Sequence, residues 1–280
     1  MERNSLLLNN QALTHFPQIP KRLTEISVFN NNIEVLPNAL WKQTDLEVLN
    51  LSMNRIQKIS KRIGTLNKLK MIDLGHNQIE KIPESIGKLT SLDSYLYLHN
   101  NKLTKLPESI GNLHQLRYLN VSMNQLQELP VTIGKLKKLV ELKLEDNLLE
   151  SLPNSIKYLV NLRELNLQDN KLKQLPKSIE NHQGLRYLNA ENNAIQSFPK
   201  GMVAIRELKL RNNRIHKIPK TISQLRMLQR LDLRGNKITS LPKEILKLKH
   251  LERLDLRWNQ GIKIPKWINK LEKKGCIVYF

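Results

Sequence analysis

An asparagine recurs along this chain at almost constant intervals. Eight of the ten gaps between these residues are 23 residues long, one is 24 and one is 20, for the series Asn31, Asn54, Asn77, Asn101, Asn124, Asn147, Asn170, Asn193, Asn213, Asn236 and Asn259. A period in this range, held nearly end to end, predicts a stack of equivalent units rather than one globular core. The repeated residues should then form the scaffold, and specificity should lie in the residues that vary between repeats.

The residues before each Asn alternate in polarity, as the unit LVELKLEDNLLESLPNSIKYL that starts at Leu139 shows. Leu142 and Leu144 are two residues apart and so point to one face of a strand, while Glu141 and Lys143 point to the other. We therefore expect a short strand with one face in the core and one face in solvent.

The residues from the Asn onward predict how the chain returns. An Asn amide both donates and accepts, so Asn147 can satisfy backbone groups that lack a partner where the chain turns inward. Pro153 cannot donate to a ladder and suits a bend after the strand. Ile156 and Leu159 are three residues apart, as one turn of a short helix requires, and should close the core from behind.

The whole pattern can be written LxxLxLxxNxΦxxΦPxxΦxxL, where Φ is apolar. Full units start at Leu23, Leu46, Leu69, Leu92, Leu116, Leu139, Leu162, Leu185, Ile205, Leu228 and Leu251. The pattern resembles the leucine-rich-repeat family over roughly residues 5 to 280. Its second half, as in LPESIGNL at 106–113, is similar to the intracellular Ras-associated subgroup and to bacterial relatives of the same type. The resemblance implies an α/β solenoid, a horseshoe with a concave parallel β-sheet and short helical or 3-10 segments on the convex side.

The pattern divides the chain into three parts. We expect an N-terminal capping half-repeat over residues 1–22, with Gln11 in its Asn slot. Eleven leucine-rich repeats should follow over residues 23–273, and a C-terminal capping strand over residues 274–280.

The last strand would be an edge of the sheet. Ile277 and Tyr279 fall in its inward slots, which would leave Cys276, Val278 and Phe280 on the concave side. An exposed edge can pair with another chain. A monomer with a simple cap is the favoured interpretation, and a dimer contact through this strand is the alternative.

The repeat pattern breaks at three internal places. One unit has an extra residue before its strand, beside Tyr95, and another loses three residues after Pro199. In the second case the segment 200–202 replaces the helical half of the unit. His182 occupies a leucine slot, and we interpret it as a tolerated, partly buried residue rather than a ligand.

The composition favours a cytoplasmic chain. No apolar run approaches the length of a membrane span, and the apolar stretch near Met1 is too short for a signal peptide. The single cysteine, Cys276, has no accompanying His or Asp pattern and is interpreted as inert. Glycosylation sequons at Asn50 and Asn120 would place a sugar on the concave strands, where it would obstruct binding. Secretion as a bacterial product stays open as the alternative.

The net charge of +21 is large, but the lysines are spread along the turns and the convex side. This distribution favours a solvated basic surface. Binding of nucleic acid or another polyanion is the alternative. A groove for single-stranded nucleic acid should interleave aromatic with basic residues, and the convex positions show almost no aromatic residues.

Large apolar and aromatic residues occupy the concave positions of the N-terminal half. They are Phe29, Met71, Tyr95, Tyr97, His99 and Tyr118. Neighbouring strands are about 4.8 Å apart, so Met71, Tyr95 and Tyr118 should form a contiguous stripe. Exposed aromatic residues on a rigid sheet are typical of interface hot spots, although Tyr also has a high strand propensity. The extra residue beside Tyr95 favours the functional interpretation.

The middle of the concave face is acidic, although the chain as a whole is basic. The acidic positions are Glu141, Glu145, Glu164, Glu191 and Glu207, with Tyr187 among them. This local reversal argues against an anionic polymer lying along the whole groove.

The C-terminal part of the concave face is rich in arginine. Arg211, Arg234 and Arg257 align in one column, Arg230 and Arg253 in another, and Asp232 and Asp255 lie between the columns. An internal ion-pair lattice and a site for a partner's acidic groups both fit this arrangement. Trp258, beside Arg257, favours a contact surface.

No catalytic constellation accompanies the repeats, and neither a cofactor nor a metal is expected. The resemblance implies that such repeats bind proteins, while catalysis comes from an attached domain. We therefore expect a non-catalytic scaffold, in signalling or host interaction, that binds another protein on its concave face. The candidate partner-binding residues are Phe29, Met71, Tyr95, Tyr97, His99, Tyr118, Glu141, Glu145, Glu164, Tyr187, Arg211, Arg230, Arg234, Arg257 and Trp258.

Overall fold

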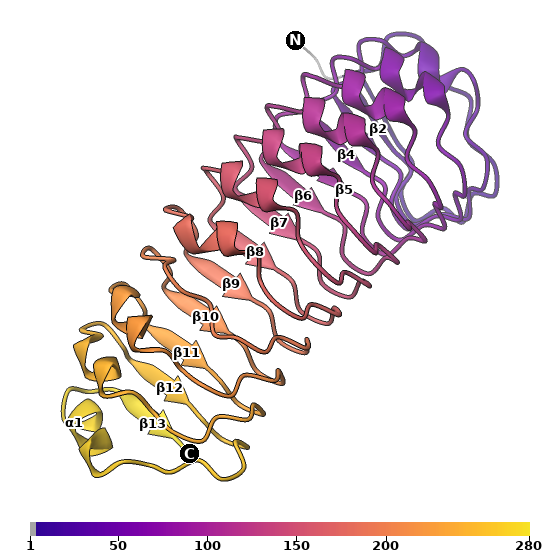
Figure 1. The fold of residues 1–280 in the computed structure, drawn as a ribbon. Coiled ribbons are helices and arrows are strands. Elements are labelled where there is room, and N and C mark those ends of the chain that lie inside the picture. Colours follow the sequence, from indigo (N-terminus) through magenta and orange to yellow (C-terminus); the bar gives the residue numbers. More distant parts are fainter. Residues whose placement is uncertain (1–3) are drawn as a thin grey trace. The chain divides into compact units, whose positions relative to one another are not determined.

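The fold is known from a computed structural model, which describes residues 4–280. The chain forms two compact units, the first ending at Lys143 and the second running from Leu144 to Phe280. In each unit, parallel three-residue strands lie side by side and short 3-10 helices follow one side of them (Figure 1).

The strands of the first unit pair in parallel, each with the next along the chain. They are β1 (Ser5–Leu7), β2 (Glu25–Ser27), β3 (Val48–Asn50), β4 (Met71–Asp73), β5 (Tyr95–Tyr97), β6 (Tyr118–Asn120) and β7 (Glu141–Lys143). The 3-10 helices behind them are η1 (Leu40–Lys42), η2 (Lys61–Thr65), η3 (Glu84–Lys88), η4 (Glu108–Asn112) and η5 (Val131–Lys135).

The second unit repeats this arrangement. Its strands are β8 (Glu164–Asn166), β9 (Tyr187–Asn189), β10 (Glu207–Lys209), β11 (Arg230–Asp232), β12 (Arg253–Asp255) and β13 (Ile277–Tyr279). Its helices are η6 (Asn154–Tyr158), η7 (Lys177–Asn181), η8 (Lys220–Gln224), η9 (Lys243–Lys247), η10 (Lys266–Ile268) and α1 (Asn269–Glu272).

The middle residue of each internal strand faces the core. Leu142 and Leu165 are fully buried, as are Leu144 and Leu167 two positions later, which confirms the predicted alternation. The first and third strand residues, together with the residue two positions beyond the third, form the opposite face of the sheet, which we call the open face. Alternation along a strand therefore separates scaffold from variable surface.

The asparagine side chains join neighbouring repeats through buried hydrogen bonds. Asn101 illustrates the pattern: its Oδ1 accepts from the backbone N–H of Ile79 at 2.9 Å, and its Nδ2 donates to the carbonyl oxygens of Leu74 and Leu98 at 3.0 Å. Asn54, Asn77 and Asn124 do the same in the first unit. In the second unit the series is Asn170, Asn193, Asn213, Asn236 and Asn259.

The extra residue near Tyr95 is absorbed just before β5. Strand β4 is in register with β5 only at Ile72 with Leu96 and at Asp73 with Tyr97. The backbone N–H of Ser94 donates to the carbonyl of Lys70 at 3.1 Å, so the displaced backbone is still bonded to the preceding repeat.

The three missing residues after Pro199 remove a helix. In the fully described segment 190–206, no 3-10 helix lies between β9 and β10, and the chain instead turns at Gly201 with φ of +84°. A Cβ atom at Gly201 would lie 1.9 Å from the carbonyl oxygen of Glu180. The deletion therefore brings this turn against the end of η7, where only glycine fits.

His182 is fully buried, whereas the sequence predicted a partly buried residue. It is only 3% exposed, its Nε2 lies 2.9 Å from the carbonyl oxygen of Leu159, and its Nδ1 accepts from the N–H groups of Gly184 and Leu185. Burial lowers the pKa of His182 below its ordinary value. The ring is thus a hydrogen-bonded part of the core.

The predicted faces of the last strand are wrong. Ile277 is paired with Arg253 and is 57% exposed, whereas Cys276 is 3% exposed. Val278, not Ile277, takes the inward register position opposite Leu254. The offset from β12 is 24 residues rather than 23, because the short helix α1 and the turn at Gly275 take up one more residue. A slip of one residue exchanges the two faces of a strand.

Replacing a ladder asparagine should destabilise the fold. In Asn124→Ala, the N–H of Leu103 loses its acceptor in the core, and the carbonyl of Leu98 keeps only the Asn101 amide as a donor. An unpaired buried group costs about 1–3 kcal/mol, so the urea midpoint should fall clearly. Asn112→Ala, at an exposed position of η4, serves as the control and should leave the midpoint nearly unchanged. Equal midpoints for the two variants would contradict the structural role of the ladder.

Gly201→Ala should also destabilise the protein, and a second glycine separates the two reasons. Gly261 has a similar φ of +79°, but a Cβ atom there would meet nothing within 4 Å, so Gly261→Ala tests backbone strain alone. Gly201→Ala adds the clash with Glu180, and overpacking costs about 1–3 kcal/mol more. Thermal unfolding of both variants should show the larger loss for Gly201→Ala, and a loss no greater than that of Gly261→Ala would exclude the close packing.

Candidate functional site

Four rings form an aromatic tract on the open face of the first unit: Tyr95, Tyr97, His99 and Tyr118. The Tyr95 and Tyr97 rings stack with centroids 4.4 Å apart and planes 20° apart. The Tyr97 and His99 rings meet edge to face at 5.9 Å. Tyr95 is in register with Tyr118 on the next strand. Ring-to-ring packing along β5 holds Tyr95, Tyr97 and His99 together, and the strand pairing places Tyr118 beside them.

The tract rests on a small residue of the preceding repeat. A Cβ atom at Gly75 would lie 2.3 Å from the His99 ring, so the ring fills the space that the Ser52 and Ser122 side chains occupy at equivalent positions. His76 meets the same ring edge to face at 4.8 Å and contacts the Asn100 amide at 2.6 Å. The position of His99 therefore depends on Gly75.

Burial favours the neutral forms of three of these rings. It raises the pKa of Tyr95 and of Tyr97 above the ordinary value of a phenol. It also lowers the pKa of His99, which outweighs the opposing effect of the Asp73 carboxylate. At neutral pH the surface accordingly offers neutral rings whose polar atoms can still form hydrogen bonds.

Two other residues were predicted for this zone. Phe29 is half-buried on the open face. Met71 is the first residue of β4, and the β4–β5 ladder pairs Ile72 with Leu96 and Asp73 with Tyr97, the two positions after it. Within the predicted stripe of Met71, Tyr95 and Tyr118, strand pairing joins Tyr95 to Tyr118.

Two of the predicted acidic residues of the open face, Glu141 and Glu207, contact basic neighbours. In the first unit the Glu141 carboxylate lies 2.9 Å from the Lys143 ammonium. In the second unit Glu207 lies 3.4 Å from Lys209, whose Nζ also lies 5.2 Å from the centroid of the Tyr187 ring. Glu145 is half-buried and Glu164 is exposed.

Asp255 organises the arginines of the second unit. It is 2% exposed, and it accepts from Arg257 Nε at 2.9 Å and from Arg257 Nη2 at 2.6 Å. Arg234 and Arg253 approach the same carboxylate at 3.6 and 3.7 Å. Burial opposes the charged form of Asp255, but the Arg257 hydrogen bonds outweigh it and lower its pKa. Much of the predicted ion-pair lattice is therefore present.

Trp258 and Arg211 extend this cluster. Trp258 is 60% exposed. The guanidinium carbons of Arg211, Arg234 and Arg257 lie 5.2, 5.8 and 5.7 Å from the centroid of its ring. Among the described residues, no carboxylate pairs with Arg211 within 4.0 Å. Its Nε is buried without a hydrogen-bond partner.

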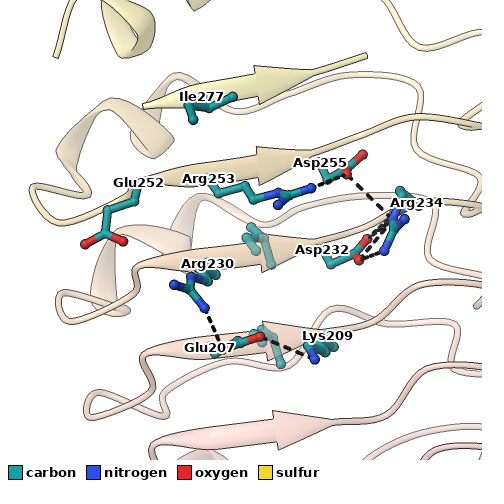
Figure 2. Close-up of a pocket in the computed structure, with 11 residues that line it drawn as sticks. Glu207, Lys209, Arg230, Asp232, Arg234, Glu252, Arg253, Asp255 and Ile277 are labelled. Carbon is teal, nitrogen blue, oxygen red and sulfur yellow. Dashed lines mark hydrogen bonds and ion pairs between the residues drawn. The ribbon is translucent and has the colours of Figure 1, made fainter. Parts of the chain in front are cut away.

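A hollow of about 530 Å³ opens on the same face over β10 to β13 (Figure 2). Along one wall, Nη1 of Arg230 lies 3.7 Å from a carboxylate oxygen of Glu207, and Arg253 points toward Asp255. Sequence reasoning omitted Arg253 from the candidate site, although it stands in the same column as Arg230. It also missed Tyr279, whose ring lies 4.9 Å from the guanidinium carbons of both Arg253 and Arg257, because the register of β13 was misassigned.

The remaining reactive groups do not form a site. Within residues 4–280, no group of three or more His, Cys, Asp or Glu side chains is placed to hold a metal ion. Burial raises the pKa of the Cys276 thiol to about 11, so it is protonated at neutral pH and a poor nucleophile. In the same described range, no helix has the length and apolar character needed to span a bilayer.

Comparison with known families decides the relationship. A family model described as a leucine-rich repeat region matches residues 93–167 and 200–273, and one described as a leucine rich repeat matches residues 21–79 and 44–103. The chain belongs to the leucine-rich-repeat family. No curated protein sequence matches this leucine-rich-repeat protein.

Solved structures with this fold include bacterial and plant proteins. A leucine-rich-repeat protein from Leptospira interrogans is 36% identical, with a TM-score of 0.84 over 92% of this chain and 66% of that one. The internalin InlF from Listeria monocytogenes is 20% identical, with a TM-score of 0.73 over 99% of this chain and 86% of that one, and shows the fold alone. The plant peptide hormone receptor RGFR1, solved in complex with RGF2, is 25% identical, with a TM-score of 0.65 over 91% of this chain and 51% of that one. The chain thus spans just under two thirds of the Leptospira protein and about half of the receptor.

Removing the central carboxylate should weaken the second unit. Asp255→Asn leaves Arg234, Arg253 and Arg257 without their shared partner, and breaking a buried pair costs about 3–5 kcal/mol when fully desolvated and less here. Asp232→Asn, the same change one repeat earlier, removes a partner of Arg234 alone and should cost less. Urea midpoints should therefore rank wild type, Asp232→Asn and Asp255→Asn in falling order. A reversed order would show that Asp255 does not organise the cluster.

Proposed function

We propose that this leucine-rich-repeat protein is a non-catalytic scaffold that binds a partner protein through the open face of its sheet. The observation that carries the proposal is the aromatic tract, in which Tyr95, Tyr97 and Tyr118 are half-buried, Tyr95 and Tyr97 stack on each other, and Tyr118 is in register with Tyr95. Tyrosines already held in place lose little conformational freedom on binding, and such residues dominate many interfaces.

The chemistry of the tract suits a peptide-like surface. Its rings offer apolar area to side chains of a partner, and its phenol groups can form hydrogen bonds with a partner's backbone. The family relationship supports the same proposal, since the similar plant receptor RGFR1 was solved with RGF2 bound. We place this binding in signalling or host interaction. Polyanion binding is supported less well, because carboxylates alternate with the basic groups on the open face.

We also propose that the protein works as a cytoplasmic monomer, with residues 1–22 and 274–280 capping repeats 23–273. The Asn50 and Asn120 side chains support a compartment without N-glycosylation, because each lies on the open face and accepts hydrogen bonds from the serine two positions later. A sugar on either side chain would cover the face to which we assign binding.

The triple variant Tyr95→Ala, Tyr97→Ala and Tyr118→Ala tests the proposal. Loss of a hot-spot side chain costs about 2 kcal/mol or more, so proteins that the immobilised wild type captures from its native cell extract should be lost from the variant. Capture is quantified by mass spectrometry, and urea unfolding checks that the variant is folded.

Tyr158→Ala is the matched control, because Tyr158 is an equally large aromatic residue that is 54% exposed on η6, away from the open face. It should capture the same proteins as the wild type. Undiminished capture by the folded triple variant would overturn the aromatic tract as the binding site.

A further inference from the structure

Trp258 adopts a backbone conformation that a bulky residue rarely adopts. Its φ is +61°, in the left-handed region, where non-glycine residues are uncommon and large ones are outliers. The equivalent turns hold Asn, Asp, Gly, His or Met, all less bulky than tryptophan, as Asn100, Gly235 and Met123 show. The turn beside the arginines thus carries the largest side chain of the series, and that side chain is exposed, which motivates a hypothesis of function.

Arg234 and Arg257, which lie beside Trp258, are held by carboxylates that use only some of their N–H donors. Asp232 accepts from Nε and Nη2 of Arg234, and Asp255 accepts from the same two atoms of Arg257. Within residues 4–280, none of these side-chain bonds uses Nη1 of either arginine. Each carboxylate therefore fixes the plane of a guanidinium group and leaves its far side available.

Arg211 supplies a third cation with fewer partners. It lies over Trp258 at 5.2 Å, has no carboxylate within 4.0 Å among the described residues, and keeps a buried Nε without an acceptor. A buried donor of this kind costs free energy. Arg211 as a whole is only half-buried, so a ligand carboxylate can meet the accessible part of its guanidinium group.

We propose that Arg211, Arg234, Arg257 and Trp258 form a recognition surface for an acidic peptide segment of the partner protein. This inference rests on the proposed function and specifies the chemistry of what the second unit binds.

The spacing of the three arginines fits such a segment. They follow β10, β11 and β12 at the same offset, because Lys209, Asp232 and Asp255 are in register. Adjacent strands are about 4.8 Å apart, so the three arginines of this column span about 10 Å, while alternate side chains of an extended peptide are about 7 Å apart. Two carboxylates of one extended segment can therefore each meet a guanidinium group.

The charge pattern favours an acidic peptide over a phosphate polymer. The open face of β10 to β13 carries more cations than carboxylates, but Glu207, Asp232 and Asp255 are fixed among the cations. The evenly spaced phosphates of a polyanion would lie close to these carboxylates and be repelled by them. A peptide can match the pattern, since it places carboxylates only where arginines lie and offers an apolar side chain to Trp258.

The test is direct binding of synthetic peptides to the purified full chain, followed by fluorescence anisotropy. The probe is a labelled peptide of alternating Asp and Ser ending in Leu, and the same peptide with Asn for Asp is the control ligand. The variant is Arg211→Gln with Trp258→Asn, which leaves the ion pairs of Asp255 in place and installs the residue found at Asn212. Lys243→Gln with Lys247→Gln removes two exposed charges from η9 and is the matched control.

The Asp peptide should bind the wild type and the η9 control equally and the Arg211 and Trp258 variant about tenfold or more weakly, as expected for the loss of charge-assisted contacts. The Asn peptide should bind at least as weakly as the variant does. No binding to the wild type, equal binding of the two peptides, or undiminished binding by the variant would overturn the proposal. Tighter binding of an oligothymidylate than of the Asp peptide would also overturn it in favour of a polyanion site.

The tyrosine triple variant separates this inference from the proposed function. It should bind the Asp peptide as the wild type does, because its substitutions lie in the first unit. If the Arg211 and Trp258 variant binds the Asp peptide as the wild type does, while the tyrosine triple variant loses partner capture, the acidic-peptide site alone is refuted. If the Arg211 and Trp258 variant loses peptide binding, while the tyrosine triple variant still captures the partner, the aromatic tract alone is refuted.

Discussion

The hydrogen bonds of the buried asparagine side chains are the constraint on which the rest of the structure depends. Each amide satisfies backbone groups in its own repeat and in the one before it, as Asn101 does with Leu98, Leu74 and Ile79. Those backbone groups lie in the core and would otherwise lack partners. By fixing one repeat against the next, the same bonds keep the strands in register, so side chains at equivalent positions form straight columns on the open face.

The two candidate surfaces use this alignment in different ways. In the first unit, Tyr95 and Tyr97 stack on each other and His99 packs over Gly75, so contact area is fixed before any partner arrives. In the second unit, Asp232 and Asp255 fix the guanidinium groups. Both arrangements fix side chains in advance, one through packing and the other through charge-assisted hydrogen bonds, and this would lower the entropy cost of binding at the proposed sites.

The sequence predicted insertions and deletions correctly wherever the spacing between two asparagines could be measured. The 24-residue gap located the extra residue before β5, and the 20-residue gap located the helix lost near Gly201. No asparagine follows β13, so nothing in the pattern marks the equivalent extra residue there, and the predicted faces of Ile277 and Tyr279 were exchanged. Contacts such as Trp258 with Arg211 join different columns through a turn, and they depend on side-chain directions that a linear pattern does not encode.

The left-handed turn next to each asparagine has an evolutionary consequence. At Met53, His76 and Asn100 its backbone N–H donates to the following repeat, so neighbouring strands hold the turn whatever side chain it bears. Methionine, histidine, asparagine, aspartate, glycine and tryptophan all occur there. The turn is thus a position where mutation can exchange one chemistry for another at modest cost in stability, so a lineage could acquire new ligands by single substitutions along this row.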